Sequence, residues 1–355
     1  MIELASGNIL KAEAEALVNT VNCVGVMGKG IALQFKQAWP ENFRAYERAC
    51  RNKEVQLGSV FTFETGRLMN PRYIINFPTK QHWRAKSRLK DIQAGLESLR
   101  EEIKRLSIHS IAIPPLGCGS GGLQWSKVEP SIRKALKHLP NVRVMLFAPE
   151  GAPAAETMPV ATRAPRLTRA RAMLIRLFES YAAAGYRLSR LEVQKLAYFL
   201  QAAGEEMNLR FAGKNYGPYA EELNHVLQRL EGHFIRGYGD RSREVRIRLL
   251  PTAAEAARDA VAGIPEADQR LERVSRLIRG FETPYGMELL ATIHWVANTQ
   301  MDAAVDADAA IVGVYSWSPR KRATFRPDHI RKAWTRLHSE GWLGQSNTRA
   351  SSSPS

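Results

Sequence analysis

The chain contains 355 residues, 45% of them hydrophobic, which is typical of a globular protein with two domains. No apolar run reaches the roughly 18 residues that a membrane-spanning helix needs, so we expect no membrane span. Residues 1–4 resemble a strand, and we expect no signal peptide. Three cysteines without metal-ligand spacing indicate a reducing cytoplasm and argue against a disulfide framework or a zinc site.

The chain is strongly basic, with a net charge of +16 and an isoelectric point near 10.0. Residues 1–162 carry 22 Lys and Arg against 14 Asp and Glu, and residues 163–355 carry 29 against 21, so each half has a net charge of +8. A basic protein favours polyanions such as nucleic acids through counterion release. A general bias of the composition toward arginine explains the same charge, so the charge alone leaves the partner open.

Two strands are predicted at the start of the chain. Residues 2–9 are typical of an edge strand followed by a turn that contains Asn8. Residues 16–22 form a second apolar run, which ends in asparagine at position 22. Open α/β sheets bind ligands at the carboxyl ends of their strands, so we expect the end of this strand to line a site.

A first glycine-rich loop follows the second strand. It contains Gly25, Gly28 and Gly30 and precedes a helix that we expect to run to about Arg51. The loop is not a P-loop, because no Ser or Thr follows Lys29 to hold magnesium, and its glycine spacing does not match a dinucleotide fingerprint. The pattern is typical of a loop that closes over a ribose or a phosphate.

Strands and helices then alternate along the chain. We expect strands at residues 58–64, 73–80 and 142–147. Amphipathic helices are expected at residues 89–106 and 126–139. This alternation predicts a three-layer α/β/α domain with a mixed sheet.

A second glycine-rich loop lies between a short apolar run at residues 111–113 and the helix expected at 126–139. It places four glycines within residues 117–122. A strand, a glycine loop and a helix start together favour phosphate binding, because glycine lets backbone N–H groups turn inward and the helix N-terminus favours an anion. A flexible connector is the alternative interpretation.

Lys80 is the candidate catalytic residue. It lies just after a strand that we expect Pro78 to end. As a neutral amine it could attack a sugar carbon, provided that burial and the cations Lys86, Arg84 and Arg88 depress its pKa. The alternatives are a charged lysine that holds an anion and a surface lysine in a basic loop.

The loop after Lys80 also carries candidate DNA contacts. His82 and Trp83 precede Arg84. An aromatic ring that can stack on a base therefore lies among cations that can bind the phosphate backbone. This combination favours single-stranded nucleic acid.

Five motifs in residues 1–149 resemble the macrodomain, the ADP-ribose-binding fold. Within this fold, the motifs most resemble the branch that contains the terminal ADP-ribose protein glycohydrolase and the DNA ADP-ribosyl glycohydrolase antitoxins. The Thr-Lys pair of that branch matches Thr79 and Lys80. In that branch the lysine is catalytic, which implies the same role for Lys80. The motifs are residues 7–9, 18–22, 28–32, 76–80 and 115–125.

The resemblance also implies which residues contact ADP-ribose. The adenine end is assigned to Asn8 and Ile9, and the distal ribose to Thr20, Val21 and Asn22. The wall along the diphosphate and ribose is assigned to Lys29, Gly30, Ile31, Ala32, Leu33 and Gln34, with Thr79 beside the catalytic lysine. The loop around the diphosphate is assigned to Gly117, Cys118, Gly119, Ser120, Gly121, Gly122 and Leu123.

One position departs from the protein-deribosylating relatives, which carry an aspartate in the second glycine loop. Ser120, Gly121 and Gly122 occupy that region here, so Lys80 acts alone or with Asn22 and a water. The resemblance therefore implies removal of ADP-ribose from thymine bases of single-stranded DNA, without a metal or cofactor. Two alternatives stay open, a protein that only binds ADP-ribose and a deribosylase of protein or RNA.

The composition changes after residue 149. Residues 150–165 are rich in Pro and Ala and predict a linker, and residues 166–345 predict a mainly helical domain. The polar residues 346–355 predict a disordered tail.

Two helices are expected early in the second domain, at residues 168–184 and 189–206, the second opened by a capping box of Ser189 and Glu192. We find no catalytic constellation in this half. The histidines lack metal spacing and are interpreted as structural or surface residues; they are His225, His233 and His294.

Part of the second half resembles the antitoxin domain named Panacea, over residues 193–201, Phe211 and residues 215–219. The resemblance implies that residues 166–345 bind and sequester the DarT toxin. Residues 216–219 are equally typical of a turn before a helix. Residues 329–343 are typical of the helix and wing of a winged-helix element, or of simple helical packing.

Overall fold

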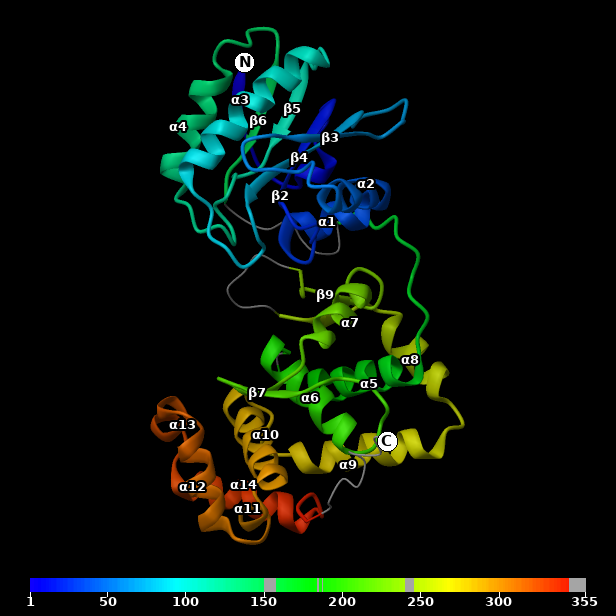
Figure 1. Cartoon of the computed structure of the whole chain (residues 1–355). Helices are drawn as coiled ribbons and strands as arrows, with labels where there is room; N and C mark the ends of the chain where they lie inside the picture. Colours follow the sequence, from blue (N-terminus) through cyan, green and yellow to red (C-terminus); the bar gives the residue numbers. More distant parts are fainter. Residues whose placement is uncertain (150–157, 184, 187, 240–245, 345–355) are drawn as a thin grey trace, which may run out of the picture. The chain divides into compact units, whose positions relative to one another are not determined.

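The structure of the chain is a computed structural model that describes residues 1–149, 158–183, 185–186, 188–239 and 246–344 (Figure 1). The chain divides into two compact units. The first comprises Met1–Ala164 and Arg236–Val245, and the second comprises Pro165–Ile235 and Arg246–Ser355.

A six-stranded mixed sheet forms the centre of the first unit, in the order β1-β6-β5-β2-β4-β3. Neighbouring strands are parallel except β3, which pairs antiparallel with β4 at one edge. The carboxyl ends of the parallel strands therefore meet at one edge of the sheet, where ligands bind in this class of fold. The strands are β1 (Ile2–Ala5), β2 (Ala16–Asn22), β3 (Phe61–Glu64), β4 (Tyr73–Lys80), β5 (Ser110–Ile113) and β6 (Arg143–Phe147).

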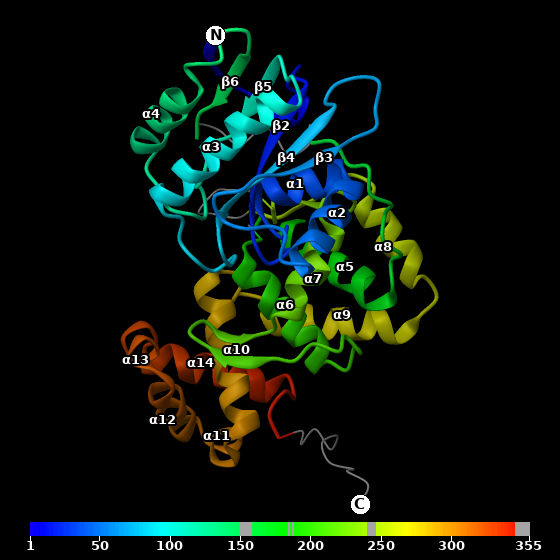
Figure 2. The same cartoon turned by 45° about the horizontal axis from the view of Figure 1, so that its top comes forward.

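Helices cover both faces of this sheet, which gives the expected three layers (Figures 1 and 2). One face packs against α1 (Gly30–Ala38) and α2 (Pro40–Arg51), and the other packs against α3 (Leu89–Arg105) and α4 (Trp125–Leu136). A short 3-10 helix, η1 (Ile9–Lys11), follows β1.

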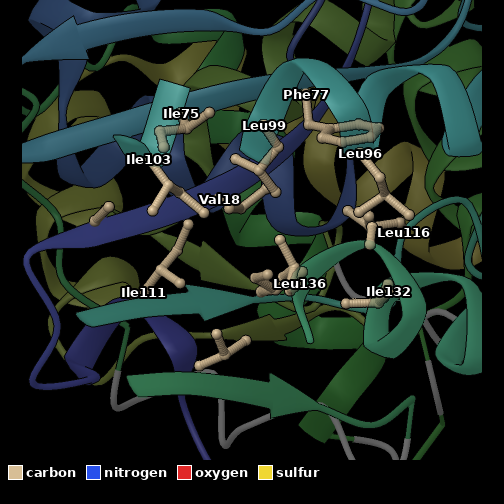
Figure 3. Close-up of a cluster of buried hydrophobic side chains, with 14 of the residues drawn as sticks. Val18, Ile75, Phe77, Leu96, Leu99, Ile103, Ile111, Leu116, Ile132 and Leu136 are labelled. Atoms are coloured by element: carbon tan, nitrogen blue, oxygen red, sulfur yellow. The ribbon is translucent and has the colours of Figure 1, made fainter. Parts of the chain in front are cut away.

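The larger core lies between the sheet and the helices α3 and α4 (Figure 3). From α3 come Leu96, Leu99 and Ile103, which lie three and four residues apart and so share one face of the helix. They contact Ile75 and Phe77 of β4, which point to the same side of the sheet. Burying each such side chain contributes about 1.5–3 kcal/mol, and this packing fixes the strand that carries Lys80.

The close approach of α3 to β4 depends on Gly95. A Cβ on this glycine would lie 2.4 Å from Cζ of Phe77, which is fully buried. Only a residue without a side chain therefore allows the helix to lie directly on the Phe77 ring.

Two local expectations for this unit are wrong. The helix expected to run to Arg51 is two helices, because Pro40 begins α2 and leaves Trp39 in a non-helical conformation. The strand β4 does not end at Pro78 but continues to Lys80. Proline is tolerated there because β3 reaches only Asn76, so no strand on that side needs the missing N–H.

The second unit is mainly helical, as expected. Its helices are α5 (Arg169–Ala183), α6 (Arg190–Ala202), α7 (Glu222–Leu230), α8 (Ala253–Val261), α9 (Pro265–Ile278), α10 (Pro284–Thr299), α11 (Met301–Val305), α12 (Ala307–Trp317), α13 (Pro319–Thr324) and α14 (Pro327–Ser339). Short strands also occur in this half of the sequence: β7 (Ala212–Lys214), β8 (Gly217–Tyr219), β9 (Ile235–Arg236) and β10 (Arg248–Leu249).

The first helices of this unit follow the sequence prediction closely. The capping box at the start of α6 is present, with Ser189 accepting from the first turn and Glu192 accepting from the Ser189 backbone. The helix ends at Ala202 and not at residue 206. Ala184, most of the predicted linker (residues 150–157) and the predicted tail lie outside the described residues.

Residues 216–219, for which a turn before a helix was one of the two interpretations, belong to a hairpin. Residues Gly217–Tyr219 form β8, which pairs antiparallel with β7. Gly217 has a φ of +87°, which glycine adopts without strain, and this favours a hairpin turn over a helix start.

The region at the end of α14 agrees with simple helical packing and not with a winged-helix element. In the described part that follows α14, residues 340–344, there is no strand to form a wing. Trp342 is instead buried and packs edge-on against Phe199 and His294. His294 also contacts the Tyr198 hydroxyl at 2.7 Å, and its burial lowers its pKa to about 4, so it serves as a neutral core residue.

No helix in the described ranges combines the length and the apolar character that a membrane crossing requires.

Candidate functional site

The candidate site begins where two parallel strands end side by side. Asn22, the last residue of β2, pairs in register with Lys80, the last residue of β4. A register shift after Val21 brings these two residues opposite each other. The strand pairing therefore unites two residues that are 58 positions apart and that were both predicted at the site.

Lys80 has the electrostatic character of a candidate nucleophile. Burial lowers the pKa of its amine from the ordinary value, and the positive charge of Lys86 lowers it further. Arg84 and Arg88 were expected to contribute. Arg84 instead lies over the ring of Trp83, and Arg88 pairs with Asp91 at 2.9 Å.

Asn22 organises the first glycine-rich loop. Its side-chain oxygen accepts from the backbone N–H groups of Val24 and Val26 at 3.0 and 3.3 Å, and its amide donates to the Val26 carbonyl at 2.6 Å. The buried Tyr46 hydroxyl donates to the Asn22 carbonyl at 2.6 Å. These contacts engage the Asn22 side chain in holding the loop.

A layer of buried amides lies beneath the strand ends. Asn19 of β2 donates to Asn76 of β4 at 3.0 Å, and Asn76 donates to Asn42 of α2 at 2.7 Å. All three side chains are fully buried. Because unpaired buried amides are costly, this chain of hydrogen bonds fixes the relative positions of the two strands and α2.

The second glycine-rich loop has the strained backbone that glycine allows. Gly117 and Gly122 have φ angles of +70° and +80°. A Cβ on Gly121 would lie 2.4 Å from the Gly117 carbonyl oxygen, so this position also excludes a side chain. The Leu123 backbone N–H donates to the same carbonyl at 3.1 Å and closes the loop just before α4.

The residues assigned to the adenine end lie at the start of η1. Asn8 caps this helix by accepting from the Leu10 backbone, and it donates to the sulfur of Met158 at 3.4 Å. Ile9 is buried in the core beneath. Met158 therefore lies against a predicted ligand residue, although the sequence analysis assigned it only to a linker.

A segment from far along the chain completes this unit at the first glycine-rich loop. The Gly30 backbone N–H, at the start of α1, donates to the Gly239 carbonyl at 2.8 Å. Arg236 donates to the Met158 carbonyl at 3.3 Å, and Tyr238 is fully buried. Gly30 was assigned to the wall along the diphosphate and ribose, and its backbone N–H is engaged by this contact with Gly239.

The basic loop after β4 presents an aromatic ring to solvent. Trp83 is 41% exposed, with the tilted ring of His82 at 5.2 Å between centroids and the Arg84 guanidinium 4.4 Å from its centroid. This arrangement places a partly exposed aromatic ring beside a positive charge, a combination that base-stacking sites use.

The remaining predicted ligand residues lie around these loops. Thr79 is buried, and its hydroxyl donates to the Val21 carbonyl at 3.3 Å. In α1, residues 31–33 are buried, and Lys29 is exposed just before the helix. The sequence analysis gave no role to Tyr46, because a lone tyrosine in a helix does not signal a contact with the end of β2. In the described ranges, no group of three or more His, Cys, Asp or Glu could hold a metal ion.

Comparisons with known proteins show the family of this chain. Residues 18–132 match the family model of the Macro domain, so the first unit is a macrodomain. Over 343 residues the chain is 49% identical to the DNA ADP-ribosyl glycohydrolase of Thermus aquaticus, which covers 97% of this chain and 94% of the relative. It is 42% identical over 355 residues to the DNA ADP-ribosyl glycohydrolase of Mycobacterium tuberculosis, covering 95% and 99%.

These identities extend over nearly the whole chain, beyond the macrodomain. The chain therefore belongs to the DNA ADP-ribosyl glycohydrolase family. A shorter match, 34% identical over 163 residues, covers 42% of this chain and 42% of a DNA ADP-ribosyl transferase–DNA ADP-ribosyl glycohydrolase fusion protein from Thermosipho africanus.

Proposed function

We propose that this chain removes ADP-ribose from DNA and that Lys80 carries the chemistry. The observation that carries the proposal is the position of Lys80, at the end of β4 opposite Asn22, with an amine whose pKa is lowered by burial and by Lys86. Family membership at 49% and 42% identity supports the reaction itself. The action is hydrolysis of the glycosidic bond between ADP-ribose and the base.

Two roles for Lys80 agree with this geometry. In the first, the neutral amine attacks the anomeric carbon of the distal ribose, a C–N bond forms to Nζ, and the base leaves with the electron pair of the broken bond. Water then cleaves the new bond and regenerates the amine. In the second, the charged ammonium stabilises negative charge on the departing base, and water attacks the sugar directly.

We further propose that the modified base is thymine and that the DNA is single-stranded. Trp83, with Arg84 beside it, supports a single strand, because a stacking ring needs an unpaired base. Residues 117–122 carry no carboxylate, which distinguishes this loop from that of the protein-deribosylating branch. The reaction restores the DNA, and we place it in the cytoplasm, which the low number of cysteines, three in 355 residues, supports.

The same chain is proposed to bind the DarT toxin through residues 166–345. The relative from Thermosipho africanus supports a link between the two activities, because its name joins a DNA ADP-ribosyl transferase with a glycohydrolase in one protein. The second unit has a core of its own, around α6 and α10, on which a binding surface can be carried.

The test is release of ADP-ribose from a single-stranded oligonucleotide that carries it on thymine. We expect the wild-type chain to release ADP-ribose and Lys80→Ala to release none, while both bind free ADP-ribose in calorimetry. Release by Lys80→Ala at the wild-type rate would remove Lys80 from the chemistry.

The alternatives predict different results in the same assay. A protein that only binds ADP-ribose would bind the ligand without releasing it from DNA. A deribosylase of protein or RNA would release ADP-ribose from those substrates faster than from DNA. Co-purification of residues 1–355 with a catalytically inactive toxin, and its loss when residues 166–355 are removed, tests the partner separately.

A further inference from the structure

A lysine on the loop after β4 lies directly against the second glycine-rich loop. The Nζ atom of Lys86 lies 3.4 Å from the point that a Cβ on Gly122 would occupy, and its Cδ lies 3.5 Å from that point. Gly122 and Lys86 are both exposed. The absence of a side chain at Gly122 therefore leaves a position beside a cation that a ligand atom can reach.

This contact is held in place by the next residue. The backbone N–H of Ser87 donates to the carbonyl of Gly121 at 3.0 Å, so residues 86 and 87 are tied to residues 121 and 122. The Ser87 side chain fills the space against Gly117, whose Cβ would lie 3.2 Å from Oγ. The loop after β4 thus forms one wall of the second glycine-rich loop.

The Ser87 hydroxyl lies against Gly117 and Gly121 of that loop. Ser87 is 7% exposed, and among the described residues its Oγ forms no hydrogen bond. A buried polar group without a partner is costly, and such groups occur where a ligand supplies the missing bond or where a loop rearranges around one.

We propose that Lys86 and Ser87 are further substrate-binding elements of the macrodomain, with Lys86 pairing with the diphosphate of ADP-ribose and the Ser87 hydroxyl forming a hydrogen bond to the same ligand. The proposal rests on the proposed function. Lys86 has no ion-pair partner among the described residues, so its ammonium is available to an anion. The usual anionic partners of a lysine ammonium are phosphate and carboxylate groups. The glycine-rich backbone beside Lys86 favours phosphate.

This arrangement also couples binding to the catalytic residue. Lys86 is the cation that acts on Lys80, and a diphosphate at Lys86 would neutralise that cation only in the substrate complex. Lys86 is thus a binding residue that influences the chemistry through Lys80.

The test is calorimetric titration of free ADP-ribose into the full chain. We expect Lys86→Ala to weaken binding about 10- to 100-fold, since a charge-assisted hydrogen bond is lost, and Lys86→Arg to retain part of it. Ser87→Ala should weaken binding while leaving the thermal midpoint of the ligand-free protein unchanged or raised, because it removes an unpaired buried hydroxyl. Lys90→Ala, an exposed lysine at the start of α3, is the matched control and should bind as the wild type.

A phosphate of the DNA backbone is the other anion that could pair with Lys86. If Lys86 binds that phosphate, Lys86→Ala would leave the affinity for free ADP-ribose unchanged and weaken only the binding of unmodified single-stranded DNA, and this result would overturn the proposal. Unchanged ADP-ribose affinity in Ser87→Ala would overturn the role of Ser87. Because this assay measures binding, failure of the wild type to release ADP-ribose from DNA would reject the proposed function separately.

Discussion

The side-chain amide of Asn22 donates to the Val26 carbonyl at 2.6 Å, which ties the first glycine-rich loop to the end of β2. The loop is therefore not held by its own backbone alone. Its shape depends on one buried side chain at the same strand end that faces Lys80.

Replacing Asn22 by Ala should lower both stability and ADP-ribose affinity. The substitution leaves the N–H groups of Val24 and Val26 without their partner, which costs about 1–3 kcal/mol for each group that stays buried. Urea unfolding followed by tryptophan fluorescence measures the first effect, and calorimetry measures the second. Asn52→Ala, an exposed asparagine after α2, controls for loss of an amide and should change neither.

Gly121→Ala should destabilise the macrodomain, whereas Gly119→Ala should not. A Cβ at Gly121 would lie 2.4 Å from a carbonyl oxygen, and a Cβ at Gly119 would meet nothing within 4 Å. Overpacking of this kind costs about 1–3 kcal/mol. Thermal unfolding of the two variants provides the comparison, and equal midpoints would mean that the loop is not packed as described.

Trp83→Ala should weaken recognition of DNA without affecting free ADP-ribose. Loss of one stacked base costs about 1–3 kcal/mol, so the KM for ADP-ribosylated single-stranded DNA should rise roughly 5- to 100-fold. Trp83→Phe should retain most of the wild-type KM, because an aromatic face is preserved. A parallel loss of ADP-ribose affinity in calorimetry would show that Trp83 acts on the ligand site instead.

The pH dependence of kcat distinguishes the two roles of Lys80. If the neutral amine attacks, kcat rises with pH through the lowered pKa of Lys80, and if the ammonium is required, kcat falls through it. Lys86→Ala removes one cause of the lowering in the free enzyme, so the pKa of Lys80 rises and either transition moves to higher pH in the profile of kcat/KM, which reports the free enzyme. An unmoved transition in kcat/KM would mean that the titrating group is not Lys80.

Lys195→Met should flatten the pH dependence of stability. Burial and the charge of Lys321 lower the pKa of Lys195 from 10.5 to about 7, and its Nζ donates to the Pro218 carbonyl at 2.7 Å. Between these pKa values the unfolded chain binds a proton that the folded chain does not, so the unfolding free energy of the wild type rises with pH. Urea unfolding at pH 7 to 10 should show a smaller rise in the variant, and equal slopes would contradict a buried neutral lysine.

The sequence predicts the architecture of the macrodomain because its strands and helices have clear periodicities. The spacing of Leu96, Leu99 and Ile103 already defines the face that α3 buries. Local rules failed where a distant neighbour decides the outcome. Pro78 lies inside β4 because the adjacent strand stops short of it, and no sequence pattern states where β3 ends.

The candidate site shows the same division. Lys80 and the two glycine loops follow from local motifs and from resemblance. The contact of Ser87 with Gly121 and the contact of Gly239 with Gly30 join backbone positions far apart in sequence. Only the folded chain brings these groups together.

The return of Arg236–Val245 to the first unit has a consequence for how this protein can evolve. The chain passes between the two units three times, at residues 164–165, 235–236 and 245–246. A single recombination point near residue 165 would therefore join one parent's Gly30 to another parent's Gly239. We expect the two halves of this chain to be inherited together.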